Sequence, residues 1–452
     1  MMNLESIKSI LLAGLIILSL VLTFGIWNQK PNSGDVMDDN RFIETDTGGI
    51  EETKKSLLEP SDIIMEVNND HYGLKNKEDE DKFYEYMHDW SLFEFESLTD
   101  SDIPEQENQV EVIFPVLIPF QVIKDLFVVD EGENIEAFNG EFNRIYILPN
   151  NNQGNVVVQF LNTKTGIKVK ANVQNVPGVR NRLEEFREEK DLIEYVAYQD
   201  NEGFPPIYLP MKSVEMTRST YTVSKINPDP YLINATFSDP SVVHDSNPSG
   251  LPSEQVYTDY YGMLRRFEYY MRFTDAKKSE RIKMDSIELI NQSVQYINKH
   301  KGWTTTKQDE YIMDTLETYP NRVVYRLFYR EYPVFDRSKN LATIELIMRG
   351  SGEGPGVYQY NRPLIELKDS LGGPSSIWLK SGEQVIHYIN NNRDQFGSNI
   401  QNISIGYQIE QTGDQDVFKL TPGWFIRDNL GWREITFKDT KEGGKGNAMG
   451  PN

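Results

Sequence analysis

The chain has 452 residues, more than one hydrophobic core of roughly 250–300 residues usually accommodates, so we expect several domains. Its 46 Lys and Arg stand against 69 Asp and Glu, and the net charge of −23 disfavours nucleic-acid binding. Cysteine is absent, which excludes disulfides, thiolate zinc sites and cysteine nucleophiles.

The first expected element is a transmembrane helix at residues 9–27. These nineteen residues carry no formal charge, and at 1.5 Å per residue they span about 28 Å, close to the roughly 30 Å hydrocarbon core of a bilayer. A cleaved signal peptide is the alternative, but its apolar region is usually about 7–15 residues and ends in a small-x-small cleavage site, which is not seen after Trp27. We expect a retained single-pass anchor in the cell membrane, with residues 1–8 as a cytoplasmic tail and the bulk of the chain extracellular.

One face of this helix combines small or hydroxylated residues with larger side chains at spacings of three and four. Small residues let membrane helices approach closely, and Ser or Thr can form hydrogen bonds between helices. The alternative is that Ser and Thr bond the carbonyl groups of their own helix. The pattern predicts a partner-contact face made of Ser9, Ala13, Ile16, Leu20, Thr23 and Trp27.

A polar tether at residues 28–46 is expected to lead into an acidic N-terminal α+β domain at 47–201. Between residues 31 and 140 there are 29 acidic and 7 basic side chains, so the negative charge of the chain is concentrated there. The expected elements are a short helix at 51–58, an edge strand or loop at 110–114 before two prolines, strands at 144–147 and 156–160, and an amphipathic helix at 180–196.

A middle α+β domain is expected at 202–369 and a C-terminal α+β domain at 370–440, followed by a disordered tail at 441–452. Each of the two domains shows a helix followed by antiparallel strands, which suggests two related units. The helices are expected at 285–299 and 381–390. Strands are expected at 265–273, 322–329, 341–349, 403–410, 416–421 and 423–427. The fold class is therefore α+β, with a single N-terminal transmembrane helix before a multi-domain extracellular part.

No familiar catalytic or phosphate-binding motif occurs in the sequence. The five histidines (His71, His88, His244, His300 and His387) are scattered and fit surface or hydrogen-bonded positions better than metal ligands. The glycine-rich stretch Gly350–Gly356 contains an acid and no base, so a hairpin loop is favoured over a phosphate site. Carboxylate pairs such as Glu310 and Asp314 carry little information among 69 acids, and the run Glu78–Asp81 lacks calcium-loop spacing. We expect no catalytic residue, no metal and no cofactor.

Short motifs in order along nearly the whole chain resemble the YycH (WalH) family. The similarity begins at Glu5–Ile10, continues through the apolar stretch to Trp27, and is weakest in the acidic segment before Gly140. The later matches are Phe237–Ser241, Tyr257–Asp259, Asn298–Trp303, Pro333–Phe335, Asn361–Leu364, Ser381–Ile386, Ile405–Tyr407 and Leu420–Trp424.

This resemblance implies a non-enzymatic, single-pass regulator of a low-GC Gram-positive bacterium. Its partners would be the sensor histidine kinase YycG (WalK) and a YycI-like protein, which it would contact through the membrane helix and the extracellular part to control cell-wall metabolism. Self-association into a homodimer stays open alongside these partners. Two alternative functions also stay open: a sensor module that binds a wall polymer or cation, and an anchored carboxylate-based wall hydrolase. The sign of regulation cannot be read from the residues.

Overall fold

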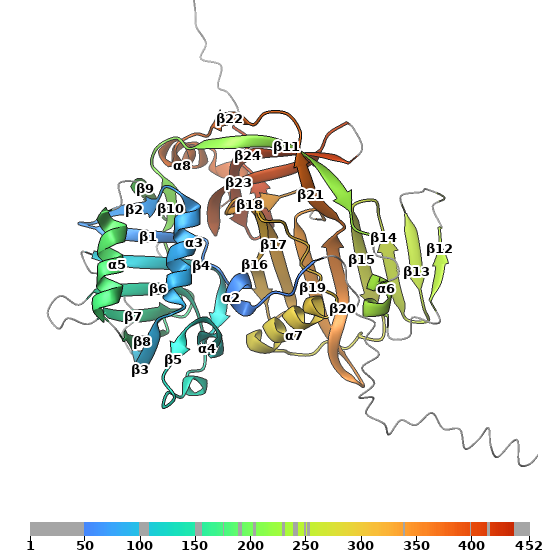
Figure 1. Cartoon of the computed structure of the whole chain (residues 1–452), viewed down its shortest axis with the longest axis horizontal. Helices are drawn as coiled ribbons and strands as arrows, with labels where there is room; N and C mark the ends of the chain where they lie inside the picture. Colours follow the sequence, from blue (N-terminus) through green and yellow to red (C-terminus); the bar gives the residue numbers. More distant parts are fainter. Residues whose placement is uncertain are drawn as a thin grey trace, which may run out of the picture. The chain divides into compact units, whose positions relative to one another are not determined.

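The structure is a computed structural model that describes residues 49–437, except for the short segments 99–107, 150–155, 175, 189–191, 202–204, 228–230, 238–242, 248–249, 251–253, 338–339, 398 and 414–415. The described residues belong to one compact unit dominated by two large sheets, with few helices (Figure 1). The expected anchor, tether and C-terminal tail lie outside these residues. In the part of the chain that is described, no helix has both the length and the apolar character needed to cross a membrane.

The first sheet has ten strands in the order β10-β9-β2-β1-β4-β6-β7-β8-β3-β5. All neighbours are antiparallel except β3 and β5. The strands are β1 (Asp62–Val67), β2 (Asp70–Leu74), β3 (Ser91–Leu98), β4 (Asn108–Pro119), β5 (Val128–Val129), β6 (Glu141–Pro149), β7 (Val156–Leu161), β8 (Lys168–Val173), β9 (Leu192–Tyr198) and β10 (Ile207–Pro210). Two helices, α3 (Lys77–Met87) and α5 (Val176–Glu188), lie over one face of this sheet (Figure 1).

The second sheet has fifteen strands, and its main path is β12-β13-β14-β15-β20-β19-β17-β18-β23-β24-β11-β21. Three further strands join at the side: β16 pairs with β17, β22 with β11, and β25 with β24. The bounds are β11 (Glu215–Lys225), β12 (His244–Ser246), β13 (Gln255–Thr258), β14 (Gly262–Arg266), β15 (Tyr270–Asp275), β16 (Asp309–Glu317), β17 (Arg322–Tyr329), β18 (Tyr332–Phe335), β19 (Thr343–Ser351), β20 (Gly354–Pro363), β21 (Ile365–Ser370), β22 (Ser375–Trp378), β23 (Asn402–Gln411), β24 (Val417–Asp428) and β25 (Gly431–Glu434).

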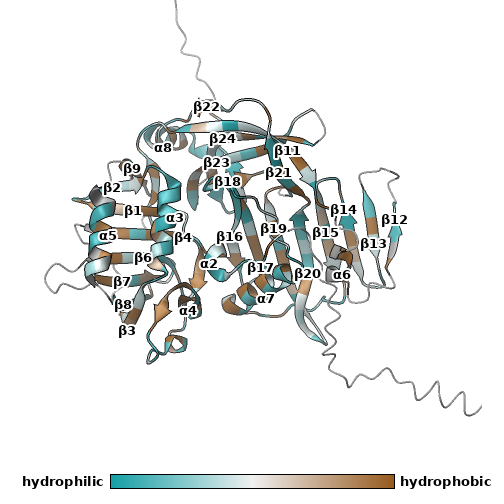
Figure 2. Ribbon diagram, viewed as in Figure 1, coloured by the Kyte–Doolittle hydropathy of each residue, from teal (hydrophilic) through white to brown (hydrophobic). Residues whose placement is uncertain are grey.

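The remaining helices are short apart from α7 and α8. They are α2 (Lys54–Leu57), α4 (Ile123–Leu126), α6 (Tyr231–Thr236), α7 (Ser286–Asn298), α8 (Gly382–Asn391) and α9 (Arg393–Phe396). Along the strands apolar positions are interrupted by hydrophilic ones (Figure 2), as expected when the faces of a sheet differ in burial.

The two longer C-terminal helices lie where the sequence predicts them. Asp285 caps α7 by accepting a 2.8 Å hydrogen bond from the backbone of Glu288, and Ser381 forms a capping box with Gln384 at the start of α8. Helix α7 packs on β16 and β17 and also contacts β4 of the first sheet, and α8 contacts β9 and β10 of the first sheet. That the two helix-plus-strand segments are related units stays a prediction.

Four local predictions are wrong. The strands expected separately at 416–421 and 423–427 form one continuous strand, β24. Residues 110–114 belong to β4, a central strand between β1 and β6 rather than an edge strand or loop. The register of β4 against β6 shifts between Ile113 and Ile118, so Pro115 falls where the ladder is interrupted and Pro119 ends the strand. The expected strand at 265–273 is instead the turn between β14 and β15, with part of each strand.

The expected helix at 180–196 ends early, because Leu192–Tyr198 forms β9 between β2 and β10. This segment contains Ile, Val and Tyr, which suit strands, and a short apolar run fits both periods.

Strand pairing also joins the sequence segments that we expect to be domains. Strand β10 lies beyond residue 201 and pairs with β9 of the first sheet. Strand β11, from the expected middle segment, pairs with β24, β21 and β22. The domain boundaries at 201/202 and 369/370 stay predictions.

Candidate functional site

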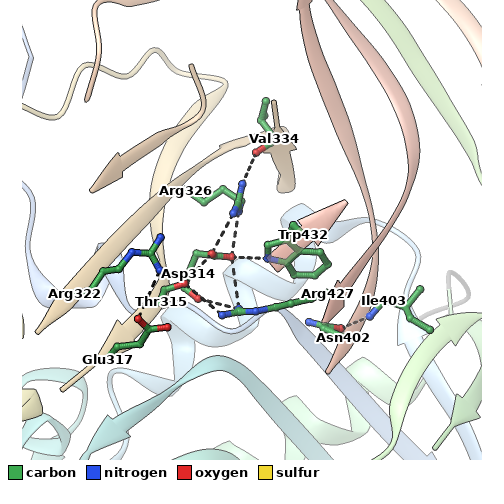
Figure 3. A network of polar contacts seen from close by, with 10 residues as sticks. All are labelled: Asp314, Thr315, Glu317, Arg322, Arg326, Val334, Asn402, Ile403, Arg427 and Trp432. Carbon is green, nitrogen blue, oxygen red and sulfur yellow. Dashed lines mark hydrogen bonds and ion pairs between the residues drawn. The ribbon is translucent and has the colours of Figure 1, made fainter. Parts of the chain in front are cut away.

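A β-bulge on β16 places Asp314 at the centre of a buried network of hydrogen bonds and ion pairs (Figure 3). Met313 pairs with Tyr325 of β17 and Thr315 pairs with Val324, so Asp314 is the extra residue between two paired positions. A bulge changes the direction of the side chain that it carries. Here it places the carboxylate of Asp314 among groups from β17, β24 and β25.

Both carboxylate oxygens of Asp314 are occupied. The oxygen Oδ1 accepts hydrogen bonds from Nε of Arg326 and Nε1 of Trp432, each at 3.1 Å. Oδ2 accepts from Nη2 of Arg326 at 3.1 Å and from the hydroxyl group of Thr315 at 3.2 Å. Arg427 donates to the backbone carbonyl of Asp314 at 3.1 Å, and its guanidinium lies 4.0 Å from Oδ1. The network therefore ties β16 and β17 to β24 and β25.

The electrostatics of Asp314 follow from this geometry. The side chains of Asp314 and Arg326 are only 9% and 10% exposed. Burial alone would raise the pKa of Asp314, but the guanidinium groups of Arg326 and Arg427 outweigh it and hold the pKa well below its usual range. Asp314 is thus a permanently ionised carboxylate with its lone pairs engaged, which suits a structural brace rather than a general base.

Aromatic packing fixes the orientation of Arg326. Its guanidinium carbon lies 4.6 Å from the ring centroid of Phe335, and Nη1 donates a 3.1 Å hydrogen bond to the carbonyl group of Val334. The ring of Phe335 stacks on Phe425 with a centroid distance of 4.0 Å and lies 5.0 Å from Trp432. The charged network is therefore enclosed by rings from β18, β24 and β25.

Two larger cavities meet at this network. The first, which we call the polar cavity, has a volume of about 760 Å³ and contains Arg322, Arg337 and Arg433 together with several acids. The second, the junction cavity, has a volume of about 620 Å³ and lies between strands of the first sheet and the β18, β23 and β24 region of the second. Asp314 and Trp432 line both, so their hydrogen bond forms part of the wall between the cavities.

A third, smaller hollow of about 160 Å³ lies where α2 and α3 face β16, and we call it the acidic pocket. Burial, followed by repulsion from Glu331, raises the pKa of Glu59 to about 8 and of Asp81 to about 8. Burial and the charges of Glu59 and Glu331 raise the pKa of Glu310 to about 10. His88 and Lys307 also line the pocket. The carboxyl groups of the acidic pocket therefore keep their protons to a higher pH than usual, whereas Asp314 loses its proton at a lower pH than usual.

The structure separates the carboxylate pair that the sequence offers as a candidate. Glu310 and Asp314 share strand β16, but Glu310 lines the acidic pocket and Asp314 lines the two larger cavities. Among the residues that the structure describes, no group of three or more His, Asp or Glu side chains is arranged to hold a metal ion. The bulge that selects Asp314 leaves no signal in the sequence, because the same strand also carries Asp309, Glu310 and Glu317.

The interpretation of two histidines is confirmed. His300 is buried, lies 3.0 Å from the hydroxyl group of Tyr360, and has its pKa lowered to about 3 by burial and by Arg362. His88 lies 2.7 Å from the carbonyl group of Leu126.

The glycine-rich stretch at 350–356 forms the hairpin between β19 and β20, as predicted. The expected partner-contact face (Ser9, Ala13, Ile16, Leu20, Thr23 and Trp27) lies outside the described residues and stays a prediction.

Comparison with known proteins places the chain in a family. The model of the YycH protein N-terminal domain matches residues 5–188, and that of the YycH protein C-terminal domain matches residues 205–442. A relative from Bacillus subtilis (strain 168), described as "Two-component system WalR/WalK regulatory protein YycH", is 21% identical over 448 residues, 95% of each chain. The crystal structure of YycH from Bacillus subtilis superposes with a TM-score of 0.67 at 18% identity, covering 86% of this chain and 99% of that one. The chain belongs to the YycH family.

Proposed function

We propose that this chain is a non-enzymatic regulator of a WalR/WalK two-component system, anchored in the cell membrane with its sheets outside the cell. The observation that carries the proposal is the match along 95% of both chains to a relative described as a WalR/WalK regulatory protein. The sheet-dominated fold, shared with a crystal structure of that family, supports it.

The chemistry of the described site is consistent with a role in contacts rather than in catalysis. The carboxylate of Asp314 uses both oxygens in hydrogen bonds to Arg326, Trp432 and Thr315. A general base needs a lone pair within reach of a substrate proton.

In the proposed mechanism the helix at 9–27 lies beside helices of the sensor kinase WalK and of a YycI-like protein. A difference of about 1–3 kcal/mol in contact free energy between two kinase states changes their ratio about 5- to 150-fold. A single helix face that packs better against one state therefore alters the control of cell-wall metabolism without any reaction.

The test compares two sets of substitutions in the helix. Phe in place of Ser9, Ala13 or Thr23 should reduce co-purification of the kinase with the full-length chain and change the output of a WalR-dependent reporter. Phe in place of Leu11 or Ile17, off the predicted face, serves as the matched control and should leave both readouts near the wild-type level. Equal effects of the two sets would remove the proposed face, and no effect of either set would remove helix contact as the mechanism.

The acidic segment is a second proposed contact. Its 29 acidic and 7 basic residues at 31–140 would attract a basic partner surface or wall cations nearest to the anchor. Replacing exposed acids such as Glu51, Glu78 and Glu85 by Gln should weaken kinase co-purification at low salt and have little effect at high salt. Equal effects at both salt concentrations would contradict an electrostatic contact.

A further inference from the structure

The junction cavity lies at one end of the strands of the first sheet. The beginning of β1, the end of β2 and the end of β10 contribute Asp62, Leu74 and Pro210 to its lining. The opposite wall comes from the turn before β18 and from the first half of β23. Its volume of about 620 Å³ falls within the roughly 300–1,000 Å³ of ligand sites, which favour the junctions between structural units.

Several aromatic rings lie among the polar and charged side chains that line this cavity. Tyr208 and Tyr332 come from the two facing sheets, and Trp424, Trp432 and Trp378 come from the C-terminal strands. Trp378 is 66% exposed, a large value for a tryptophan. Rigid aromatic side chains provide contact area at little entropic cost, which is why they recur at binding sites.

Among the strands that the structure describes, the first half of β23 pairs with a neighbour on one side only. Strand β24 pairs with β23 from Asn402 to Gln411, whereas the pairing with β18 comprises only Tyr407 and Gln408. The residues before Tyr407 that lack this second partner are the ones that line the cavity, from Asn402 to Ile405. A strand edge of this kind is a template for pairing with another extended chain.

The direction of the backbone groups supports this interpretation. The carbonyl group of Trp424 accepts a hydrogen bond from the N–H of Ile435, so the backbone of Trp424 faces away from β23. Ile405 lies opposite Trp424, and in an antiparallel pair such residues direct their backbone groups to the outer edges. The N–H and C=O groups of Ile405 and of Ile403, two residues earlier, therefore point to the cavity side of β23.

Side chains of the same strand occupy part of that edge. The N–H of Ile403 donates a 2.8 Å hydrogen bond to the side-chain oxygen of Asn402, as drawn in Figure 3. The hydroxyl group of Ser404 donates a 2.9 Å hydrogen bond to the carbonyl group of Ile405. Such local bonds compete with strand pairing and are exchanged when a strand is added.

We propose that the junction cavity binds an extended polypeptide segment, which pairs with the edge of β23 at Ile403 and Ile405 and places an apolar side chain among the aromatic rings. In this mode main-chain hydrogen bonds provide affinity and pockets for alternate side chains provide specificity. The C-terminal residues 438–452 of the chain itself contain no aromatic residue and only one apolar side chain longer than alanine, Met449, so they suit this cavity poorly. The N-terminal residues 28–48, expected to connect the membrane helix to Ile50, lead to the pairing of Ile50 with Trp303, which does not line this cavity. We therefore assign the cavity to a segment of another protein.

The same site offers a route to the polar cavity. A side chain that displaces the ring of Trp432 breaks its hydrogen bond to Asp314, the contact that both cavities share. Occupation of the junction cavity would then change the contacts that Arg326 and Arg427 make with Asp314 on the polar-cavity side of the wall.

The test uses the full-length chain in nanodiscs and a blocked peptide of alternating valine and threonine with a lysine at each end. At millimolar peptide we expect a shift in tryptophan emission and about tenfold slower amide exchange at Ile403 and Ile405. A peptide of the same sequence with alternate amides N-methylated cannot pair as a strand and should produce neither change.

Two variants locate the binding. Ser213→Trp fills the mouth of the cavity without altering β23 and should abolish both changes, whereas Ser370→Trp, on exposed β21 outside the cavity, should preserve them. Unchanged exchange at Ile403 and Ile405, an equal response to the N-methylated peptide, or binding that survives in Ser213→Trp would each overturn the proposal. So would a response to chitotetraose in place of the peptide, which would assign the rings to a sugar. Because the readouts involve no kinase, their failure leaves the regulatory function untouched.

Discussion

Strand β16 carries a half-buried carboxyl group, Glu310, and a buried one, Asp314, whose pKa values are shifted in opposite directions. Asp314 meets the guanidinium groups of Arg326 and Arg427, and its pKa is held well below the usual range despite burial. Glu310 is half-buried near Glu59 and Glu331, and its pKa rises to about 10. The free-energy cost of removing a carboxylate from water is thus offset by guanidinium in one place and by a proton in the other.

Burial alone does not decide whether a carboxyl group is charged. The charges of the neighbouring side chains decide it as well. Asp314 is directed by its bulge toward β17, β24 and β25, which supply the cations. Glu310 lines a pocket with Glu59 and with Asp81 and Glu85 of α3, which belong to the acidic segment of the chain. The excess negative charge of this segment therefore raises the pKa of Glu310, where the segment meets the second sheet.

The largest expected effect comes from breaking the Asp314 network. Asp314→Ala should lower the free energy of unfolding of the full-length chain by about 3–5 kcal/mol, because it leaves Arg326 buried without its carboxylate. Urea unfolding followed by tryptophan fluorescence measures the change. The double variant Asp314→Leu with Arg326→Met removes both charges and should be much less destabilised than the single variant. If the two are equally destabilised, the ion pair is not what the single substitution breaks.

The pH dependence of stability should show two separate limbs. Glu59 and Asp81 have folded-state pKa values raised to about 8, so they contribute stability below about pH 4 that is lost as the pH rises toward 8. Asp314 has a lowered folded-state pKa, so its contribution is present above about pH 4 and is lost as the pH falls below it. Unfolding free energies measured between pH 3 and 9 should pass through a maximum. A stability that rises steadily up to pH 9 would contradict the raised pKa values.

Replacing one carboxyl group in the acidic pocket by an amide should reduce the loss of unfolding free energy at high pH. Glu310→Gln keeps the shape of the side chain and removes the need to take up a proton on folding. At pH 9 Glu310, with a pKa raised to about 10, holds its proton in the folded protein but is ionised in the unfolded chain, so the unfolding free energy of the variant at pH 9 should be higher by about 1–2 kcal/mol. At pH 5, where Glu310 is protonated in the folded protein, the variant should match the wild type closely. Glu383→Gln, an exposed position on α8, provides the control. A loss of stability of the variant at pH 9 would contradict the raised pKa of Glu310.

The smallest effect is expected at the wall between the two cavities. Trp432→Phe preserves a ring near Phe335 but removes the N–H that donates to Asp314, which should cost about 1 kcal/mol. A double-mutant cycle with Asp314→Ala should show coupling, since the two side chains share the bond. Additive effects would mean that the wall is held by packing alone.

Part of this arrangement could be predicted from the sequence. Helices α7 and α8 carry their start signals locally, in Asp285 and in the capping box of Ser381, so their positions are predictable. Strand β9 was not predicted, because its short apolar run fits a helix and a strand equally and only pairing with β2 and β10 selects the strand.

The Asp314 network could not be predicted from the sequence, for a different reason. The bulge at Asp314 depends on the register of β16 against β17, and Arg427 comes from a strand more than a hundred residues later. No local pattern contains that relation. The family resemblance, by contrast, could be recognised from motifs spread along the chain, since it needs no geometry.

The central claim, that the chain regulates a WalR/WalK system by contact and without catalysis, is tested most directly by the output of a WalR-dependent promoter in its host. Deletion of the chain should change promoter activity, and both the wild type and a stable double variant, Asp314→Leu with Arg326→Met, should restore it, because the network braces the fold and performs no reaction. Promoter activity that is the same with and without the chain would contradict the regulatory role, and failure of a folded double variant to restore it would contradict the structural role of Asp314.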